Sequence, residues 1–407
     1  MDKKLCIVMV GLPARGKSVH ATKLKENLEK DDILVQVFNN GDVRRRLLPE
    51  NTSHAEFYDP NNDKCAALRE EIALVNIYEA KEFLRGKGQV AVLDATNATL
   101  ARRHKIECHL AEFSIFYIEC INENNDLVAA SIARKTRGPE FEHLSPEDAF
   151  KSLFERIEMY KKSYVPLTNE TNFVTIDAVS NKILRERISA VIPFYPRVRD
   201  ILVSDWVKSL FLIRHGQTDY NLEYRIGGNS GLTEKGWSQA RAMAAHFRDV
   251  DIPCIFTSTK KRTTQTAQPL LEDREDGTIL SLSEFDEINA GICEHMTYEE
   301  IQRLHPDVHD ARTKDKYNYI YPGGEGYGTL KQRVYRGIKK AIFLSGKSDN
   351  IMIIGHQAVN RMILSHFLFR RTEDVPYIYI PQNKYFHIIS TQTRKVFELK
   401  TFSPPTA

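Results

Sequence analysis

A glycine-rich loop between an apolar run and a helical pattern constrains this chain more than any other feature. Residues 5–10 are almost continuously apolar, which is typical of a strand buried in a parallel sheet. Residues 11–18 then fit the pattern G-x-x-x-x-G-K-[ST] without a gap. Ala21, Leu24 and Leu28 follow at helical spacing. A loop between a strand and a helix is the context of a phosphate-binding loop; a chance Gly-Lys-Ser turn is the alternative.

The chemistry of such a loop explains which residue types it needs. Backbone N–H groups of the loop and the positive end of the following helix bind an anion. Lys17 is placed for the β- and γ-phosphates of a nucleoside triphosphate, and the Ser18 hydroxyl is placed for Mg²⁺. The predicted nucleotide-binding residues are Gly11, Ala14, Arg15, Gly16, Lys17 and Ser18.

Composition indicates an ordinary globular protein. A chain of 407 residues suggests two domains, and 42% apolar with 27% charged residues is typical of globular proteins. A net charge of +3 gives no argument for a nucleic-acid partner. No apolar stretch approaches the roughly 18–20 residues that span a bilayer. The six cysteines form no C-x-x-C pair, and His104 with Cys108 is more simply a chance pair than a zinc site. We expect a reduced, cytoplasmic protein without a membrane partner.

The first half of the chain alternates strand-like runs with helical stretches. The expected strands are 5–10, 35–38, 89–93, 115–119 and 173–176. This alternation predicts a parallel sheet with helices on both faces. Ser145-Pro146-Glu147-Asp148 is typical of a helix start, and the helix is expected to run to about Tyr164. Residues 186–208 contain two prolines and no clear period, so we expect domains at 1–200 and 201–407.

Two strand ends in this half carry candidate ligand-binding groups. The third expected strand runs into Asp94, a Walker-B-like partner for Mg²⁺, and Thr96, which is placed to orient an acceptor hydroxyl. Capping of the next helix is the alternative role for Asp94. Arg44-Arg45-Arg46 follows the second strand, where open α/β sheets bind ligands, although a solvated basic helix face is the alternative. Because no H-R-D or D-F-G motif of protein kinases appears, a small-molecule kinase is favoured.

The second half contains a different kind of phosphate chemistry. A core strand at 210–213 runs into Arg214-His215-Gly216. Neutral imidazole is a good nucleophile toward phosphorus, and an adjacent arginine lowers its pKa and holds the phosphate. Arg262 and His356 each follow an expected strand, and Glu287 is a candidate proton donor. Each of these groups alone has an ordinary structural explanation, but together they predict a phosphohistidine site.

These motifs, in this order and spacing, resemble the bifunctional 6-phosphofructo-2-kinase/fructose-2,6-bisphosphatase family. The matching segments are 11–18, 93–97, 214–216, 290–301 and 355–359. The resemblance runs from residue 5 to about 395 and implies two α/β domains. The first is a P-loop kinase domain with a mainly parallel sheet, and the second is a histidine-phosphatase domain like that of phosphoglycerate mutases. The first would transfer the γ-phosphoryl group of ATP to O2 of fructose 6-phosphate, and the second would remove it through a phosphohistidine.

The resemblance also implies roles for individual residues. In the first half, Lys17, Ser18 and Asp94 resemble the ATP–Mg²⁺ residues. The fructose 6-phosphate site is implied at Arg44, Arg69, Thr96, Arg102, Lys135, Arg156 and Tyr160. In the second half, His215 resembles the nucleophile and Glu287 the acid that protonates the leaving sugar oxygen. The phosphoryl clamp is implied at Arg214, Asn221, Arg262 and His356. Contacts to the sugar and its 6-phosphate are implied at Gly227, Tyr298, Arg312, Lys316, Tyr327, Gln357 and Arg361.

The chain departs from the family pattern at a few positions. In the second half these are Gln217, Asn289, Asn318, Ile320 and Gly323, and in the first half Asp42 and Arg46. The leading hypothesis is an enzyme that both makes and hydrolyses fructose 2,6-bisphosphate, and the resemblance implies a homodimer through the kinase half. An enzyme that works mainly in one direction and a sugar-phosphate-sensing pseudoenzyme are the alternatives.

Overall fold

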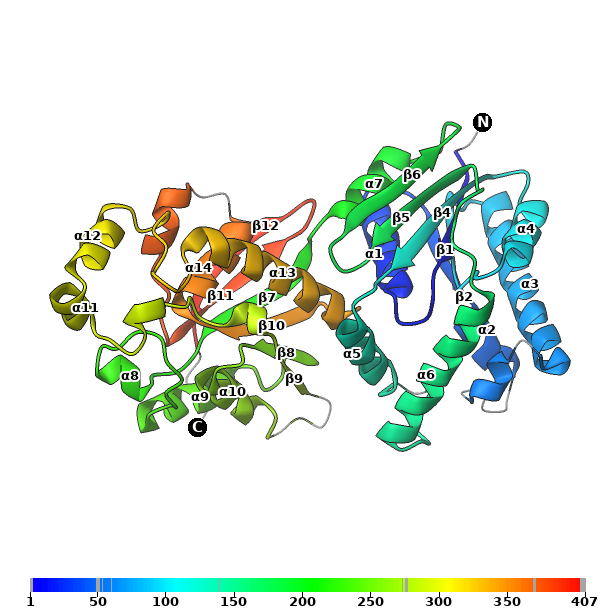
Figure 1. Ribbon diagram of the computed structural model, residues 1–407. Coiled ribbons are helices and arrows are strands. Elements are labelled where there is room, and N and C mark those ends of the chain that lie inside the picture. The colour runs from blue at the N-terminus through cyan, green and yellow to red at the C-terminus, as the bar shows by residue number, and fades with distance from the viewer. Residues whose placement is uncertain are drawn as a thin grey trace. The chain divides into compact units, whose positions relative to one another are not determined.

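The computed structural model describes residues 3–48, 52, 54–59, 61–138, 140–272, 274, 277–368 and 371–402. The chain divides into two compact units, residues 1–205 and 206–407, and each is built on its own sheet (Figure 1). Among the described residues, no helix has the length and apolar character needed to cross a membrane.

The described residues of the first unit form a six-stranded sheet in the order β2-β3-β1-β4-β5-β6. Its strands are β1 (Leu5–Val10), β2 (Val35–Asn39), β3 (Val90–Asp94), β4 (Ser114–Ile121), β5 (Asn172–Asp177) and β6 (Lys182–Ile188). The first five in this order pair in parallel, and β6 pairs antiparallel with β5. The prediction of a mainly parallel sheet is therefore confirmed.

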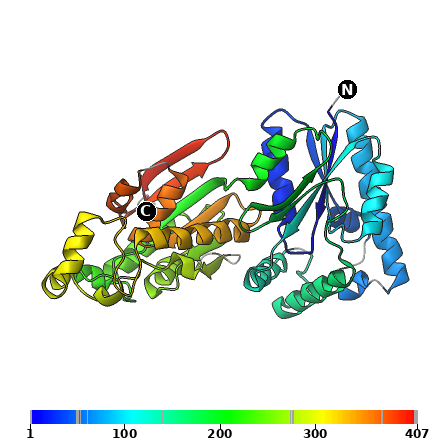
Figure 2. The same cartoon turned by 45° about the horizontal axis from the view of Figure 1, so that its top comes forward.

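Helices cover both faces of this sheet, as Figure 2 shows for α1 and α7 on one side and α3 and α4 on the other. The helices are α1 (Lys17–Glu29), α2 (Asn40–Leu47), α3 (Asp63–Arg85), α4 (Leu100–His109), α5 (Asn125–Lys135), α6 (Pro146–Ser163) and α7 (Tyr195–Val203). All six residues of β1 are buried, because alternate side chains meet helices on opposite faces. Cys6, Val8 and Val10 pack in one core with Ile77 and Leu84 of α3.

The parallel register brings three loops to one edge of this sheet. Asn39, at the end of β2, lies opposite Asp94, at the end of β3. Val8 of β1 lies opposite Leu93 of β3, so the glycine loop leaves the sheet at the same edge. This is the edge at which open α/β sheets bind ligands.

The structure corrects one expectation in this unit. Residues 186–208 show no clear sequence period, yet they contain the end of β6 and the whole of α7. Pro196 stands in the first turn of α7, where its missing N–H costs nothing, and Val198, Ile201 and Leu202 are buried. The two units do divide inside this stretch, between residues 205 and 206, but its two prolines obscured a short amphipathic helix that the missing period did not predict.

The described residues of the second unit form another six-stranded sheet, in the order β12-β11-β7-β10-β8-β9. Its strands are β7 (Val207–Arg214), β8 (Cys254–Thr257), β9 (Thr278–Ser281), β10 (Asn350–Gly355), β11 (Lys384–Ser390) and β12 (Lys395–Thr401). The central strands pair in parallel, and the β11–β12 hairpin adds antiparallel strands at one edge. The expected α/β fold is confirmed, while β9, β11 and β12 were not predicted.

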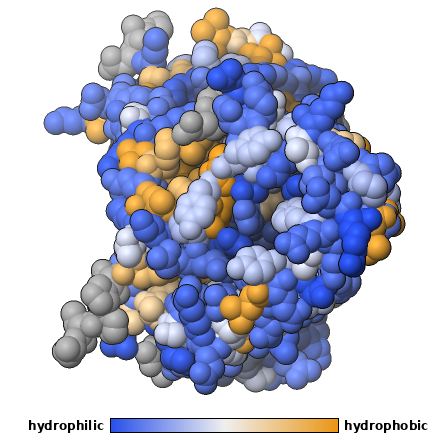
Figure 3. All heavy atoms as spheres, turned by 90° about the vertical axis from the view of Figure 1, so that its left-hand side faces the viewer, coloured by the Kyte–Doolittle hydropathy of each residue, from blue (hydrophilic) through white to orange (hydrophobic). Residues whose placement is uncertain are grey.

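Helices again pack against the second sheet, among them α9 (Glu234–His246), α10 (Lys261–Ala267), α13 (Tyr327–Ser345) and α14 (Gln357–Phe367). Further helices of this unit are α8 (Asp219–Leu222), α11 (Tyr298–Leu304) and α12 (Pro306–Lys314). Phe211, Ile213 and Met352 pack with Met243 and Phe247 of the α9 region in one core. The face of this unit that carries α11 and α12 is mostly hydrophilic and is hollowed near its centre (Figure 3).

Two parallel neighbouring strands of this sheet, β7 and β10, end at the same edge, as the strands around the glycine loop do in the first sheet. Arg214 of β7 lies opposite Gly355 of β10, and the His215 backbone N–H donates to the Gly355 carbonyl oxygen at 3.0 Å. The residues that follow both strands, His215 and His356, therefore start from neighbouring backbone positions.

Candidate active sites

The glycine loop of the first unit has the geometry of an anion cradle. Gly11 has φ 138°, and a Cβ there would lie 2.5 Å from the Cys120 carbonyl oxygen, so only glycine fits. Gly16 has φ 89° and precedes the first turn of α1. The loop thus delivers the free N–H groups at the start of α1 to the sheet edge.

Lys17 and Asp94 lie close enough in this cradle to influence each other electrostatically. Lys17 is 8% exposed, and its Nζ donates to the Leu12 carbonyl oxygen at 2.8 Å. Burial, with the nearby positive charge of Lys135, lowers the pKa of Lys17 to about 7, while the Asp94 charge opposes this shift. Asp94 is 4% exposed and accepts a hydrogen bond from Asn39 Nδ2 at 2.7 Å. The Asp94 charge therefore offsets only part of the effect of burial on Lys17, and the charged form of Lys17 would gain from bound phosphates.

A cavity of about 290 Å³ lies beside the loop after β3. Six of the seven residues expected at a sugar phosphate line it: Arg44, Arg69, Thr96, Arg102, Arg156 and Tyr160. Lys135 does not line it, and its charge acts on Lys17 instead. Residues from α2, α3, α4 and α6 thus converge on one concave, strongly basic surface.

Several arginines of this cavity have N–H donors that no described residue accepts. Arg44 and Arg156 both donate to Oε1 of Glu140, at 2.7 and 3.1 Å, and the Arg156 guanidinium lies 3.8 Å from the centre of the Tyr58 ring. The Nε atoms of Arg44, Arg102 and Arg156 are buried and have no hydrogen-bond partner among the described residues. Buried, unsatisfied donors of this kind are suited to an anionic ligand.

The run Arg44-Arg45-Arg46 separates into different environments. Arg44 is buried and lines the cavity. Arg45 is exposed and pairs with Asp42, and Arg46 is exposed and pairs with Glu79. The basic-face explanation therefore applies to two of the three arginines, and Asp42 and Arg46, the departures in this half, lie outside the cavity lining.

The second unit brings His215 and His356 together. Their ring centroids lie 5.2 Å apart, and both residues are buried. His215 Nδ1 lies 2.7 Å from the Gly216 carbonyl oxygen, so this nitrogen carries the proton and Nε2 keeps its lone pair. His356 Nδ1 accepts from Arg262 Nε at 3.2 Å, and its Nε2 donates to Ser258 Oγ at 2.8 Å. Both rings are therefore fixed by hydrogen bonds as neutral tautomers.

Electrostatics keep these rings neutral. Burial, reinforced by the charges of Arg262 and Arg214, lowers the pKa of His215 well below its usual 6.5. Burial and the Arg262 charge do the same to the pKa of His356. A buried neutral imidazole between two guanidiniums is the arrangement that a phosphorus nucleophile needs.

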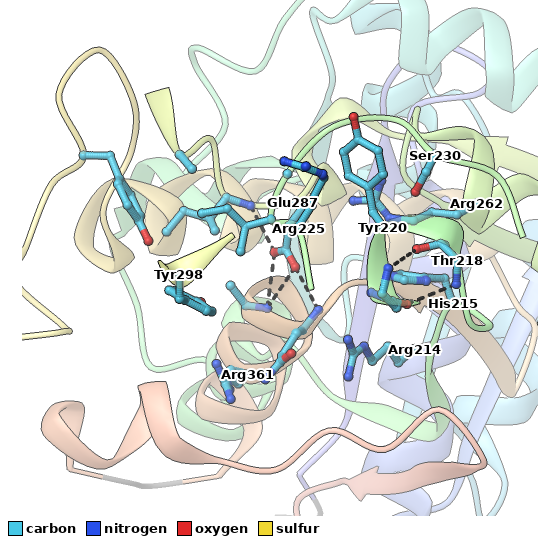
Figure 4. A pocket seen from close by; sticks show the side chains of 18 of the residues that line it. Arg214, His215, Thr218, Tyr220, Arg225, Ser230, Arg262, Glu287, Tyr298 and Arg361 are labelled. Atoms are coloured by element: carbon cyan, nitrogen blue, oxygen red, sulfur yellow. Dashed lines mark hydrogen bonds between the residues drawn. The ribbon is translucent and has the colours of Figure 1, made fainter. Parts of the chain in front are cut away.

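A cavity of about 180 Å³ opens in front of His215 (Figure 4). Glu287 lines it and accepts hydrogen bonds from the backbone N–H groups of Gln357 at 3.0 Å and Ala358 at 3.2 Å, at the start of α14. His356 is next to His215 but does not line the cavity. Every other residue predicted for this half lines it: Arg214, His215, Asn221, Gly227, Arg262, Glu287, Tyr298, Arg312, Lys316, Tyr327, Gln357 and Arg361.

The end of the cavity away from His215 is basic and aromatic. The Arg312 guanidinium lies 5.1 Å from the Tyr298 ring centre and donates to Tyr298 Oη at 3.3 Å. Arg361 Nη1 donates to Tyr327 Oη at 3.1 Å. Burial, with the charges of Arg312 and Arg361, lowers the pKa of Lys316 to about 8. A ligand with one anionic group at His215 and a second at this end of the cavity would offset the positive charges of Arg312, Lys316 and Arg361.

The departures from the family pattern in this half lie outside the cavity lining. Gln217 Oε1 accepts from Thr233 Oγ1 at 3.1 Å, and Asn318 Nδ2 donates to Asp315 at 2.8 Å. Asn289, Ile320 and Gly323 are exposed. None of these five residues lines the cavity.

Sequence reasoning missed several residues that shape the two sites. Tyr58 supports Arg156, and Ser258 fixes the His356 tautomer. Gln382 Nε2 bonds both the His215 carbonyl oxygen at 3.2 Å and Asn221 Oδ1 at 2.9 Å. None stands in a motif, and each reaches its site from a distant part of the chain, so no local signal identifies it.

Comparisons with known proteins divide the chain in the same way. Residues 1–195 match the 6-phosphofructo-2-kinase family model, and residues 210–402 match that of the histidine phosphatase superfamily (branch 1). The 6-phosphofructo-2-kinase/fructose-2,6-bisphosphatase 3 of Rattus norvegicus is 34% identical over 389 residues, which cover 92% of this chain and 68% of that protein. This chain belongs to the 6-phosphofructo-2-kinase/fructose-2,6-bisphosphatase family.

Other members of the 6-phosphofructo-2-kinase/fructose-2,6-bisphosphatase family match as well. The protein numbered 1 in Mus musculus is 35% identical over 385 residues, which cover 92% of this chain and 79% of that protein.

Among solved structures, the alpha-ribazole phosphatase of Shigella flexneri aligns with a TM-score of 0.44 and 25% identity, covering 48% of this chain and 96% of that one.

Proposed function

We propose that this chain makes fructose 2,6-bisphosphate in its first unit and hydrolyses it in its second. The observation that carries the proposal is that each unit holds its own cavity lined by several arginines. Arg44 and Arg156 line the first, and His215 and Arg262 line the second. Family membership supplies the sugar substrate.

In the first unit, ATP would bind with its phosphates in the cradle from Gly11 to Ser18. Lys17 would hold the β- and γ-phosphates, and the basic cavity would hold the phosphate of fructose 6-phosphate so that its O2 faces ATP. The glycine cradle and the Lys17–Asp94 pair fit a magnesium nucleotide, with Ser18 and Asp94 as the Mg²⁺ ligands. Bound Mg²⁺ would neutralise charge on the transferring phosphate.

In the second unit, His215 Nε2 would attack the phosphorus of the 2-phosphate. The N–P bond forms as the bond from phosphorus to O2 breaks, and Glu287 gives its proton to the leaving O2. Water then attacks the phosphohistidine, Glu287 takes the proton of that water, and inorganic phosphate leaves His215. Arg214 and Arg262 stabilise the charge on the transferring group in both steps.

The proposal is tested with the purified chain in two assays. With ATP labelled at the γ-phosphate and fructose 6-phosphate, the label should appear on O2 of the sugar, as judged by the acid lability of the product. With 2-labelled fructose 2,6-bisphosphate, acid-free quenching should trap label on His215. Transfer to another hydroxyl, or hydrolysis without label on His215, would overturn the assignment.

We also propose a homodimer that forms through the kinase unit, in the cytoplasm. Edge strand β6 supports the first statement, because Leu184 and Ile188 are exposed there. The six cysteines, all free, support the second. Sedimentation of the wild-type chain and of Leu184→Lys tests the dimer, and a wild-type monomer would contradict it.

A further inference from the structure

The phosphatase cavity contains a serine hydroxyl group that has no role in the proposed reaction. Ser230 lines the cavity together with His215, Arg262 and Glu287 (Figure 4). Its Oγ is buried and has no hydrogen-bond partner among the residues that the structure describes. The sequence gives no sign of this, because Ser230 stands in a loop beside glycines.

The loop that carries Ser230 is tied to the residues around Arg262. Arg262 Nη1 donates to the Gly228 carbonyl oxygen at 2.9 Å, and the Lys261 backbone N–H donates to Asn229 Oδ1 at 2.8 Å. The Leu232 backbone N–H donates to Gln265 Oε1 at 3.0 Å. Bonds on both sides of Ser230 therefore hold the loop backbone in place, and Arg262 makes one of these bonds.

A buried hydroxyl without a hydrogen-bond partner destabilises the folded chain unless a ligand supplies that partner. The other polar groups of this part of the cavity favour an anion: Arg214 Nε is also buried without a partner among the described residues. A phosphoryl oxygen accepts hydrogen bonds only, and the Ser230 hydroxyl has a proton to donate.

We propose that Ser230 is a further phosphate-contacting residue, whose hydroxyl donates to an oxygen of the phosphoryl group that Arg214 and Arg262 hold. The inference rests on the proposed phosphatase function of this cavity. Ser230 would then bind the group before and after its transfer to His215, and its hydrogen bond with the charged oxygen would contribute to both steps.

The test compares Ser230→Ala with Ser238→Ala, an exposed serine of α9 outside the cavity. Orthovanadate, an analogue of the transferring phosphoryl group, is titrated calorimetrically with saturating ATP present, so that the P-loop is already occupied. The melting temperature is measured without any anion. Turnover of fructose 2,6-bisphosphate is measured in parallel.

Ser230→Ala should bind orthovanadate about tenfold more weakly than the wild type, because a hydrogen bond to a charged group is lost. Its melting temperature should be unchanged or higher, because no buried hydroxyl is left unsatisfied. Ser238→Ala should match the wild type in both measurements. Together these results would support the proposal.

Two results would overturn it. Equal orthovanadate affinity in Ser230→Ala and wild type would show that the hydroxyl does not contact the anion. Weaker affinity together with a lower melting temperature would show that the hydroxyl only supports the fold. A wild type that binds orthovanadate without hydrolysing the bisphosphate would contradict the proposed substrate, and the Ser230 titration would still decide this inference.

Discussion

At the scale of single residues, the proposed phosphatase chemistry depends on an uncharged His215. Burial and the charges of Arg262 and Arg214 place its pKa well below 6.5, so the neutral nucleophile persists as the pH falls through 6.5. We expect the rate of phosphohistidine formation, measured by rapid quench, to show no loss near pH 6.5. In Arg262→Gln the pKa should rise, and the acid limb should move to higher pH. A wild-type inflection at or above pH 6.5 would contradict this explanation.

Lys17 gives the kinase cradle its own pH signature. With a pKa of about 7, most free Lys17 is neutral at pH 8, and bound phosphates favour its charged form. ATP binding at pH 8 should therefore take up close to one proton, and at pH 6 almost none. Calorimetry in two buffers of different ionisation enthalpy measures this uptake. Lys17→Met should abolish it, and uptake that persists in Lys17→Met would assign the proton to another group.

The three consecutive arginines provide a matched set of variants. Arg44 lines the sugar cavity and leaves an unsatisfied Nε for the ligand, whereas Arg45 and Arg46 are exposed and paired with acids. Arg44→Ala should raise KM for fructose 6-phosphate by about tenfold or more, the effect of losing a charged hydrogen bond. Arg45→Ala and Arg46→Ala should change KM less than twofold. Equal effects at all three positions would indicate a general electrostatic field instead.

The sequence identified residues well where chemistry and chain position coincide. Asp94, His215 and His356 stand at or directly after strand ends, and Lys17 follows the glycine loop after β1, so each parallel sheet brings its own residues to one edge. The family resemblance singled out Arg44, but the sequence pattern itself could not rank this residue above its neighbours, because only the turn of α2 determines which of them faces inward. Nor could it find Tyr58, whose contribution depends on packing between segments far apart in the chain.

At the scale of elements, the P-loop depends on backbone that only glycine adopts at Gly11. A Cβ there would meet the Cys120 carbonyl oxygen at 2.5 Å, and φ 138° is strained for any other residue. Gly11→Ala should destabilise the kinase unit by about 2 kcal/mol or more and abolish ATP binding. Urea unfolding and ATP titration measure the two effects.

Gly328→Ala is the matched control for that variant. An added Cβ at Gly328 meets nothing within 4 Å, and the residue lies in α13 of the other unit. The free energy of unfolding of Gly328→Ala should equal that of the wild type or exceed it by up to about 1 kcal/mol. If Gly11→Ala behaved like Gly328→Ala, the cradle would not have the geometry described here.

Strands could be predicted from the sequence where their residues form a continuous apolar run. β1 is buried on both faces and reads as a continuous apolar run. Strand β6 is exposed along nearly all its length and alternates charges, so its sequence lacks the signal of a buried strand. The hairpin strand β12 is similar. Edge strands follow from pairing with a neighbour, which a local pattern does not contain.

At the scale of the whole molecule, one chain carries the kinase and phosphatase units of its family. Each unit has its own sheet, its own core and its own cavity lined by arginines. The residues that depart from the family pattern lie outside both cavity linings.

The most direct test is to measure both activities in Lys17→Ala and His215→Ala, each as the full chain. Lys17→Ala should lose synthesis of fructose 2,6-bisphosphate and keep wild-type hydrolysis. His215→Ala should lose hydrolysis and keep wild-type synthesis. If either substitution abolished both activities in a folded chain, or if neither activity followed its assigned residue, the two-site account would be contradicted.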